Sequence, residues 1–410
     1  MAYELNEARI KVLEAAKRCQ DDGLIVRTWG NISARISDTQ FVITPSGRAY
    51  ESLSPEDIVI VDIKKCTYEG DLKPSSESGI HADVYAMRPE ANFVIHTHQT
   101  YASCVSILGE DIELSEEEQT FLGDKIPCAE YGMSSSEKLR KQVKKCLKSN
   151  TKANSMLLRN HGVLCIGTDF DNAFEISSMM EQVCKYKYEM LVSGFDKVNA
   201  KGDSEENPEK WDEVLASEED LNKSGFVDYG TSSCEGNQVK LTLGEKEYTF
   251  SLTDPKPLGK SIFKKNLNKI AKLHQKIYED RSISNICHVT LPNIVDVSKK
   301  DYDFIPYIDD QAQIVGDDVK CVGKINKKPH FESAKAISKA LKKDNAVLIA
   351  GQGALVVGGS ESDVEACAYV LEKGCLAAKL AICNGKAQSV PKLIAKKERK
   401  FYVESYSKLK

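Results

Sequence analysis

The feature that most constrains the fold of this chain is an internal repeat. The segment LLRNHGVLCIG (157–167) aligns with LIAGQGALVVG (348–358) at a constant offset of 191 residues. Upstream, IHADVYAMRPEANFVIH (80–96) parallels LHQKIYEDRSISNICH (273–288), and both contain a His followed four residues later by a Tyr. Self-similarity at a fixed period predicts one folding unit that is built twice. A fold proposed for the first half must therefore also suit the second.

An acidic and polar segment separates the two copies. Residues 197–223 contain many carboxylates and few aliphatic side chains, which is typical of a linker. A chain of 410 residues is long enough for two or three domains. We therefore predict a first unit over 1–196, a linker over 197–223 and a second unit over 224–410.

Composition excludes several classes of protein. The net charge is −5, so nothing attracts nucleic acid or an anionic membrane. The longest weakly polar run, 346–359, is too short to span a bilayer. The first 20 residues have an amphipathic helical pattern with acidic side chains, which does not fit a signal peptide. The thirteen cysteines form no C-x-x-C pair, so we expect reduced thiols and a cytoplasmic protein.

The hydrophobic pattern of the first half predicts helices alternating with strands. The expected helices cover 5–21, 77–88, 136–148 and 169–191. The expected strands cover 30–37, 40–47, 57–63 and 92–98, and 155–167 is predicted to be one strand interrupted at a glycine. Strands with helices on either side predict an α/β sandwich.

Three histidines are candidate metal ligands. His96 and His98 are two residues apart in the predicted strand 92–98, and alternate residues of a strand point to the same face. His161 precedes Gly162, where the backbone is free to turn. Three imidazoles suit a zinc-like ion with an open coordination position. The H-x-H pattern taken alone fits surface or core histidines equally well.

Several turns are rich in the residue types that bind anions. Ser75 and Ser76 lie at the start of the predicted helix 77–88, with Glu77 in its first turn. Backbone N–H groups and hydroxyls at a helix start can bind a phosphate. The turns TWGNIS and ITPSG could contribute further groups. Each of these patterns also fits an ordinary turn or helix cap.

Five motifs in a fixed order resemble those of one known family. GNIS, ITPSG, KPSSES, VIHTH and LLRNHGVLCIG occur in this order, and together they strongly resemble the class II aldolase/adducin family, with L-fuculose-phosphate aldolases as the most similar branch. The resemblance covers about residues 5–195, and the second half looks like a degenerate copy. It implies a nine-stranded-type, three-layer α/β/α sandwich that is present twice in tandem.

The resemblance also implies roles for individual residues. It implies a divalent ion, Zn²⁺ or another such as Mn²⁺ or Co²⁺, bound by His96, His98 and His161. Glu77 matches the catalytic carboxylate. The positions that match the family's phosphate site or flank it are Thr28, Gly30, Asn31, Ser46, Gly47, Ser75 and Ser76. Aldolases of this type use tyrosines as proton donors, and the candidates in this chain are Tyr131, Tyr402 and Tyr406.

The function implied by the resemblance is that of a metal-dependent aldolase, a carbon–carbon lyase. It would cleave a phosphorylated ketose, such as a fuculose-phosphate-like sugar, into dihydroxyacetone phosphate and an aldehyde. One alternative is a ribulose-phosphate-type 4-epimerase, or a decarboxylase or dehydratase of sugar-acid phosphates, in the same superfamily. The other alternative is a non-catalytic scaffold such as adducin.

The second half lacks the residues of the implied site. The counterparts of Glu77, His98 and His161 are Ile270, Thr290 and Gln352, and His288 alone survives. This predicts that the second unit binds no catalytic metal. The resemblance also implies a ring of four subunits. We therefore expect a homo-oligomer, in which two chains of two units each form a pseudo-tetramer.

Overall fold

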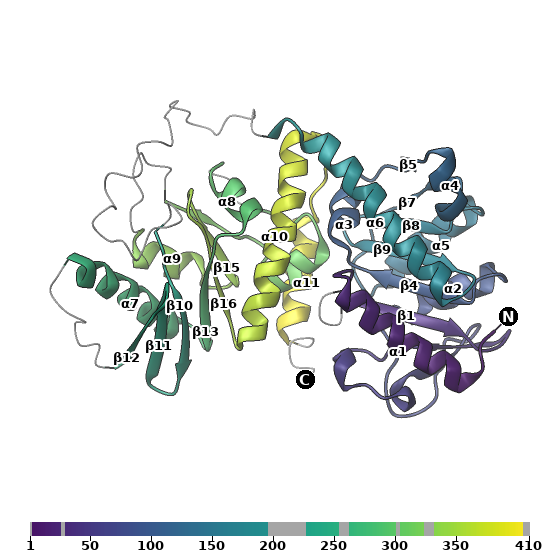
Figure 1. Cartoon of the computed structure of the whole chain (residues 1–410), viewed down its shortest axis with the longest axis horizontal. Coiled ribbons are helices and arrows are strands. Elements are labelled where there is room, and N and C mark those ends of the chain that lie inside the picture. Colours follow the sequence, from purple (N-terminus) through teal and green to yellow (C-terminus); the bar gives the residue numbers. More distant parts are fainter. Residues whose placement is uncertain are drawn as a thin grey trace. The chain divides into compact units, whose positions relative to one another are not determined.

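The computed structural model of the chain describes residues 2–25, 29–195, 227–253, 262–300, 304–323 and 332–404. Contacts divide the chain into two units, which Figure 1 shows. The first unit holds the chain up to Ser193, the short segment Tyr307–Asp309 and the chain from Leu380 onward. The second unit holds Gly194–Pro306 and Asp310–Lys379. The predicted linker 197–223 lies outside the described residues.

The first unit is built on a seven-stranded sheet with the strand order β3-β2-β1-β4-β9-β8-β7. Neighbouring strands are antiparallel except for the parallel pair β7 and β8. A separate antiparallel pair is formed by β5 and β6, so the nine described strands of this unit are split between two sheets. The strands are β1 Gly30–Arg35, β2 Gln40–Ile43, β3 Val59–Asp62, β4 Phe93–Thr97, β5 Ile112–Glu113, β6 Lys125–Ile126, β7 Cys128–Ala129, β8 Ser155–Leu158 and β9 Gly162–Gly167.

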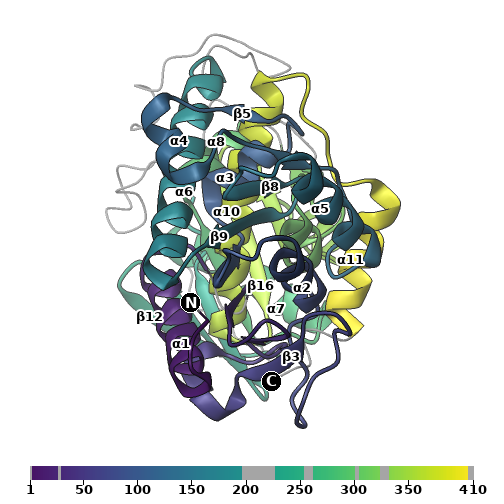
Figure 2. The ribbon, with the colours of Figure 1, turned by 90° about the vertical axis from the view of Figure 1, so that its right-hand side faces the viewer.

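Helices cover both faces of this sheet. One layer contains α1, α3 and α6, and the other contains α2 and α5, with the strands between them (Figure 2). The helices of the first unit are α1 Leu5–Asp21, α2 Ser78–Met87, α3 Thr100–Ser106, α4 Glu116–Leu122, α5 Glu137–Ser149, α6 Phe170–Val192 and α11 Lys392–Glu404, with 3-10 turns at Tyr50–Ser52 and Pro55–Asp57. The predicted three-layer α/β/α sandwich is therefore confirmed. No helix in the described ranges combines the length and hydropathy that a membrane crossing requires.

One predicted strand is wrong. Residues 155–167 do not form a single interrupted strand but an antiparallel hairpin of β8 and β9, with Leu158 opposite Gly162. The chain reverses at Asn160, whose φ of 58° lies in the left-handed region. Asparagine adopts this conformation more readily than most residues. The pattern concealed the reversal, because both strands are buried along their whole length and neither shows an alternation of polar and apolar residues.

The second unit repeats the topology of the first. Its sheet has the strand order β12-β11-β10-β13-β16-β15-β14, again with one parallel pair, β14 and β15. The strands are β10 Thr231–Glu235, β11 Gln238–Leu243, β12 Lys246–Ser251, β13 Asn285–Val289, β14 Cys321–Val322, β15 Ala346–Ile349 and β16 Gly353–Gly358. The helices are α7 Ile262–Asp280, α8 Pro292–Ser298, α9 Ala334–Ala340 and α10 Glu361–Cys383, with a π-helical turn at Gln311–Val315. The predicted duplication is confirmed at the level of strand order.

A glutamate that recurs in both repeats has a structural role. Glu181 on α6 accepts hydrogen bonds from the backbone N–H groups of Tyr101 and Ala102 at the start of α3 (2.8 and 3.0 Å). In the second unit, Glu372 on α10 does the same for the N–H groups of Asn293 and Ile294 at the start of α8. The carboxylate satisfies N–H groups that have no partner within the helix.

A charged cluster joins α2 to α5 on the outer face of the first unit. Asp83 on α2 has only 5% of its side chain exposed and accepts hydrogen bonds from Arg140 and Lys144 on α5. Burial opposes ionisation of Asp83, but the hydrogen bonds and charges of its two partners lower the pKa of this carboxyl. Gly79 leaves space for the Arg140 side chain, which lies 3.0 Å from where a β-carbon would be.

Replacing Asp83 with asparagine is expected to lower the free energy of unfolding of the first unit by about 1–2 kcal/mol at pH 7. Because the pKa of Asp83 is depressed by folding, this stabilisation exists above the unfolded pKa and is lost as the pH falls through the folded pKa. In a Trp211→Phe background, Trp29 is the sole tryptophan, and its fluorescence during urea unfolding reports the first unit.

The difference between D83N and its parent should shrink as the pH is lowered below about 4. The matched control is Glu14→Gln, which removes an exposed partner of Lys11 and should cost less than about 0.5 kcal/mol. A deficit in D83N that is the same at every pH would show that packing, rather than charge, supplies the stability.

Candidate metal centre and substrate site

The three histidines predicted as metal ligands meet at one end of β4. His96 lies on β4, His98 directly follows it, and His161 lies in the turn between β8 and β9. Because β9 pairs with β4 with Leu164 opposite His96, this turn lies beside the end of β4. One potential ligand nitrogen of each ring lies within 4.8 Å of the other two. The fold thus brings together three residues that the sequence keeps far apart.

Gly162 is required for this approach. A β-carbon at this position would lie 2.4 Å from the carbonyl oxygen of Thr97 and 3.1 Å from Cδ2 of His98. The second unit has the same constraint, because a β-carbon at Gly353 would lie 2.3 Å from the carbonyl oxygen of Val289. The glycine after His161 is therefore required by the fold of both repeats. The histidine itself is present in the first repeat and is replaced by Gln352 in the second.

Hydrogen bonds donated by Nδ1–H orient two of the rings. The Nδ1–H of His96 donates to the carbonyl oxygen of Val163 at 2.7 Å. The Nδ1–H of His161 donates to a carboxylate oxygen of Asp309 at 3.2 Å. With Nδ1 acting as the donor in each ring, Nε2 is the nitrogen left for a metal ion.

Glu77 lies between these two Nε2 atoms. It is the residue just before α2, and its side chain is only 7% exposed. Its carboxylate oxygens lie 3.1 Å from Nε2 of His96 and 3.4 Å from Nε2 of His161. Burial opposes ionisation, but the charges of the two histidines hold the pKa of Glu77 well below its usual range. The backbone N–H of Ser135 also donates to this carboxylate at 3.1 Å.

The residues of this centre fit a divalent cation. The Nε2 atoms of His96 and His161 are buried and make no hydrogen bond of normal geometry to any described residue. Burial opposes a charge on His161, yet the charge of Glu77 and the hydrogen bond to Asp309 raise its pKa to about 10. Buried carboxylates beside the rings favour such a cation.

A buried chain of hydrogen bonds leads to Glu77 and ends at its carboxylate. Tyr85, Ser33 and His81 are linked by bonds of 2.7 Å and 2.6 Å. Burial lowers the pKa of His81 to about 3, so its ring is neutral and donates Nε2–H to Oδ1 of Asn31 at 2.5 Å. This bond turns the Asn31 amide so that its Nδ2–H donates to Glu77 at 3.4 Å.

Sequence reasoning assigned no role to Ser33, His81 or Tyr85. The available signal was the His-and-Tyr pair that both repeats share. In the second unit, His274 lies between Ser232 and the backbone oxygen of Tyr229, and Tyr278 bonds to the same serine. The chain of hydrogen bonds is thus common to both units, and the link to a carboxylate through Asn31 belongs to the first.

Four of the residues predicted to bind phosphate, Ser46, Gly47, Ser75 and Ser76, lie on two loops that are joined to each other. The N–H of Ser46 donates to the carbonyl oxygen of Lys73, and the N–H of Ser75 donates to that of Thr44. Gly30 begins β1, where a β-carbon would lie 2.7 Å from the carbonyl oxygen of His96. Thr28 lies outside the described residues.

A cavity of about 220 Å³ opens beside Glu77. It is lined by Ser76, Ser135 and Arg140, and lies where α2 and α5 begin. The hydroxyls of Ser76 and Ser135 are 2.7 Å apart. Ser76 and Glu77 therefore face this cavity, whereas Ser46, Gly47 and Ser75 do not line it.

The three candidate proton donors have different surroundings. The Tyr131 hydroxyl donates to Asp309 at 2.8 Å, and burial together with the charge of Asp309 raises the pKa of Tyr131. Tyr402 lies half-buried on α11. Tyr406 lies outside the described residues. Tyr131 is connected to the candidate metal centre through the carboxylate that also binds His161.

The second unit uses the corresponding positions for structural hydrogen bonds. Gln352, the counterpart of His161, accepts the backbone N–H of Val227 at 2.9 Å. His288 donates Nε2–H to the carbonyl oxygen of Gln352 at 2.7 Å and accepts the N–H of Tyr229 on Nδ1. Both of its nitrogens are occupied. Within the described residues, the sole group with metal-binding geometry is that of the first unit.

A comparison with protein families finds a match in each repeat. Residues 10–188 and 249–378 match the family described as Class II Aldolase and Adducin N-terminal domain. The chain is 32% identical over 195 residues to the L-fuculose phosphate aldolase of Haemophilus influenzae, a span of 47% of this chain and 88% of that protein. It is 34% identical over 172 residues to a 5-methylthioribulose-1-phosphate/5-deoxyribulose-1-phosphate aldolase of Escherichia coli, covering 42% of this chain and 78% of that protein.

One solved structure among the matches is that of an L-fuculose 1-phosphate aldolase. It is 27% identical, covers 52% of this chain and 95% of its own, and has a TM-score of 0.42. The family match extends over both repeats and over more than half of the residues. The chain therefore belongs to the class II aldolase and adducin N-terminal domain family.

Proposed function

We propose that this chain is a metal-dependent aldolase that cleaves a phosphorylated ketose into dihydroxyacetone phosphate and an aldehyde. The observation that carries the proposal is the position of Glu77. Its carboxylate lies between two histidine rings and also lines the cavity where α2 and α5 begin. A group able to transfer protons is thus placed between a metal centre and a candidate site for an anion.

The metal centre would consist of His96, His98 and His161. Three neutral imidazoles suit Zn²⁺ and also accept Mn²⁺ or Co²⁺, and we propose Zn²⁺ as the resident ion. A bound divalent ion would stabilise the negative charge that develops on the substrate oxygens when the carbon–carbon bond breaks. His96 and His161 are already oriented by their Nδ1 hydrogen bonds, so they need no rearrangement to present Nε2.

Glu77 is proposed as the acid/base. In aldol cleavage a proton leaves a substrate hydroxyl, and a proton is later added to a carbon of the enediolate. A carboxylate with a depressed pKa is ionised at neutral pH and can accept the first proton. Asn31 and the N–H of Ser135 hold this carboxylate in place while the proton is transferred.

The substrate phosphate is proposed to lie near Ser76, where the cavity meets the start of α2. Backbone N–H groups at a helix start attract anions, and the hydroxyls of Ser76 and Ser135 can donate to phosphate oxygens. Anchoring the phosphate there would hold the sugar against Glu77 in one orientation. Asn31, Ser46, Gly47 and Ser75 remain proposed as further phosphate-binding positions.

A direct test is to measure dihydroxyacetone phosphate released from ketose 1-phosphates. L-fuculose 1-phosphate and 5-deoxyribulose 1-phosphate are the first substrates to try, because the relatives described above are aldolases for these sugars. We expect product from at least one of them, loss of activity after chelation, and recovery when Zn²⁺ is added. Ribulose phosphate should be tested in the same assay, and its epimerisation without cleavage would indicate an epimerase instead. A metal-loaded protein that turns over none of these sugars would favour a scaffold.

A further inference from the structure

The segment Tyr307–Asp309 lies in the second repeat by sequence but belongs to the first unit by its contacts. It is held beside the metal centre by Asn160. The Asn160 side chain donates to the carbonyl oxygen of Tyr307 at 2.7 Å, and the carbonyl oxygen of Asn160 accepts the N–H of Asp309 at 2.9 Å. The residue that holds this segment is thus the neighbour of the ligand His161.

The two repeats have different residues at the turn that contains Asn160. Asn160 and its counterpart Gly351 both have positive φ angles, 58° and 70°. Glycine is the residue that adopts this conformation without strain. The first repeat instead has asparagine, whose side-chain amide also donates to the carbonyl oxygen of Gln388 at 2.6 Å. The amide therefore joins this turn to two other segments of the chain, and a glycine has no side chain that could do so.

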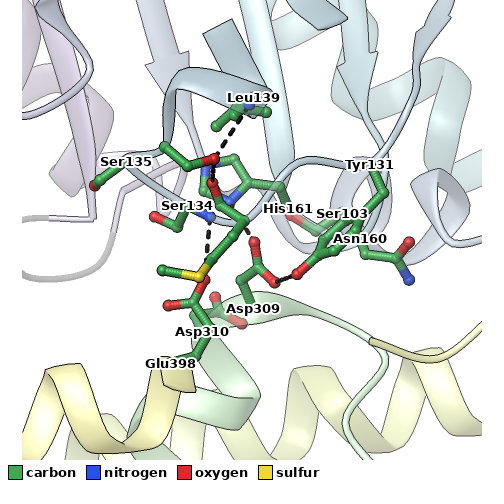
Figure 3. Close-up of polar contacts among 12 residues, drawn as sticks. Ser103, Tyr131, Ser134, Ser135, Leu139, Asn160, His161, Asp309, Asp310 and Glu398 are labelled. Atoms are coloured by element: carbon green, nitrogen blue, oxygen red, sulfur yellow. Dashed lines mark hydrogen bonds and ion pairs between the residues drawn. The ribbon is translucent and has the colours of Figure 1, made fainter. Parts of the chain in front are cut away.

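The side chain of Asp309 contacts two candidate functional residues at once, as Figure 3 shows. One carboxylate oxygen accepts the Nδ1–H of His161 at 3.2 Å. The other accepts the Tyr131 hydroxyl at 2.8 Å. The Asp309 side chain is fully buried. A buried carboxylate is costly unless its oxygens accept hydrogen bonds and a cation lies near, and a metal ion on His161 would meet the second need.

We infer that Asp309 is a positioning residue of the metal centre, which holds His161 for the ion and Tyr131 at the edge of the site with a single carboxylate. The inference rests on the proposed metal function. A carboxylate behind a metal-binding imidazole fixes the ring's tautomer and orientation and makes Nε2 a better donor. The Nδ1–H of His96 donates to a neutral backbone carbonyl. The corresponding acceptor at His161 is Asp309, which places a negative charge behind that ring.

The reading in which Asp309 only anchors its own segment makes a different prediction. The backbone of this segment is held by Asn160 whether or not residue 309 carries a carboxylate. Under that reading, Asp309→Asn would change stability but not the affinity for metal. Under ours, the affinity and the ligand field of the ion both change, because the amide has no charge and cannot serve both partners as an acceptor in the same way.

The experiment is metal binding by the full chain, measured by competition with a chromophoric chelator, together with the visible absorption spectrum of the Co²⁺-substituted protein. We expect D309N to weaken Zn²⁺ binding by about 10-fold and Asp309→Ala by about 10- to 100-fold, each with a shifted Co²⁺ spectrum. Tyr131→Phe keeps the bond from Asp309 to His161 and should change the affinity by less than about threefold.

The matched control is Asp83→Asn, which removes the charge of a buried carboxylate in the same unit without a contact to a histidine ligand. Its metal affinity should equal that of the wild type. Unchanged affinity and spectrum in D309N, with a wild type that binds the ion, would overturn this inference and leave the proposed function standing. A wild type that binds no metal at all would overturn both. Because D309N is nearly isosteric, the test does not depend on D309A being folded.

Discussion

Replacing His161 with alanine is expected to reduce the bound metal from about one ion per chain to almost none. Only two of the three imidazoles would remain, and the buried carboxylate of Glu77 would lose one of the two rings beside it. The charge stabilisation supplied by a metal ion is worth several kcal/mol in a transition state, so cleavage should fall at least about 10³-fold. Metal analysis of the purified variant and the assay for dihydroxyacetone phosphate measure the two effects.

The control for this variant is His288→Ala. It makes the same substitution at a histidine of the second unit whose nitrogens are both occupied by backbone groups. H288A should keep its metal and change the cleavage rate by less than about threefold, although it should lose some stability because buried backbone groups lose their partners. Full metal content in H161A would contradict the three-histidine site. Loss of metal in H288A would contradict a single site in the first unit.

Replacing Glu77 with glutamine is expected to leave the ion bound and to lower the cleavage rate by about 10²- to 10⁴-fold. The amide has the size of the carboxylate but cannot accept a proton. It also replaces one negative oxygen with an NH₂ group. An NH₂ group is a poor neighbour for the donors that now face the carboxylate, such as the N–H of Ser135. The loss should appear in kcat, because the proton transfer is needed in the transition state.

A half-reaction isolates this role of Glu77. In D₂O, the wild type should exchange a carbon-bound proton of dihydroxyacetone phosphate without any aldehyde present, and E77Q should not, as followed by proton NMR. The matched control is Glu130→Gln, which removes the charge of a side chain that is 63% exposed and paired with Arg159. This variant should exchange at the wild-type rate. Exchange by E77Q within tenfold of wild type would rule out Glu77 as the proton-transfer group.

Local sequence signals predicted four helices and four strands of the first unit. The helix expected over 5–21 is α1, Leu5–Asp21, and the strand expected over 92–98 contains β4, Phe93–Thr97. These segments have a clear period of hydrophobic residues, and such patterns depend on neighbours only a few residues away. The hairpin of β8 and β9 was missed because its strands are buried on both faces and leave no alternation to read.

The histidines of the candidate site could be named from the sequence, but their supporting groups could not. His96 and His98 are two apart, and His161 lies in a recognisable motif. Ser33 and His81 resemble ordinary core polar residues until their bonds to each other and to Asn31 are seen. The repeat itself was a usable clue, because a polar pair that persists in both halves needs a structural reason.

The sequence by itself determined that one α/β unit occurs twice and that the first copy retains the histidines and the carboxylate. Periodicity and motif order are properties of the chain, and they do not depend on which distant residues meet. Only the tertiary structure decided that Glu77 lies between His96 and His161 and that Asp309 lies behind His161. Asp309 is 148 residues from its partner, in a segment with no motif, and its role exists only because chain folding carries it to a buried site where a charge must be paired.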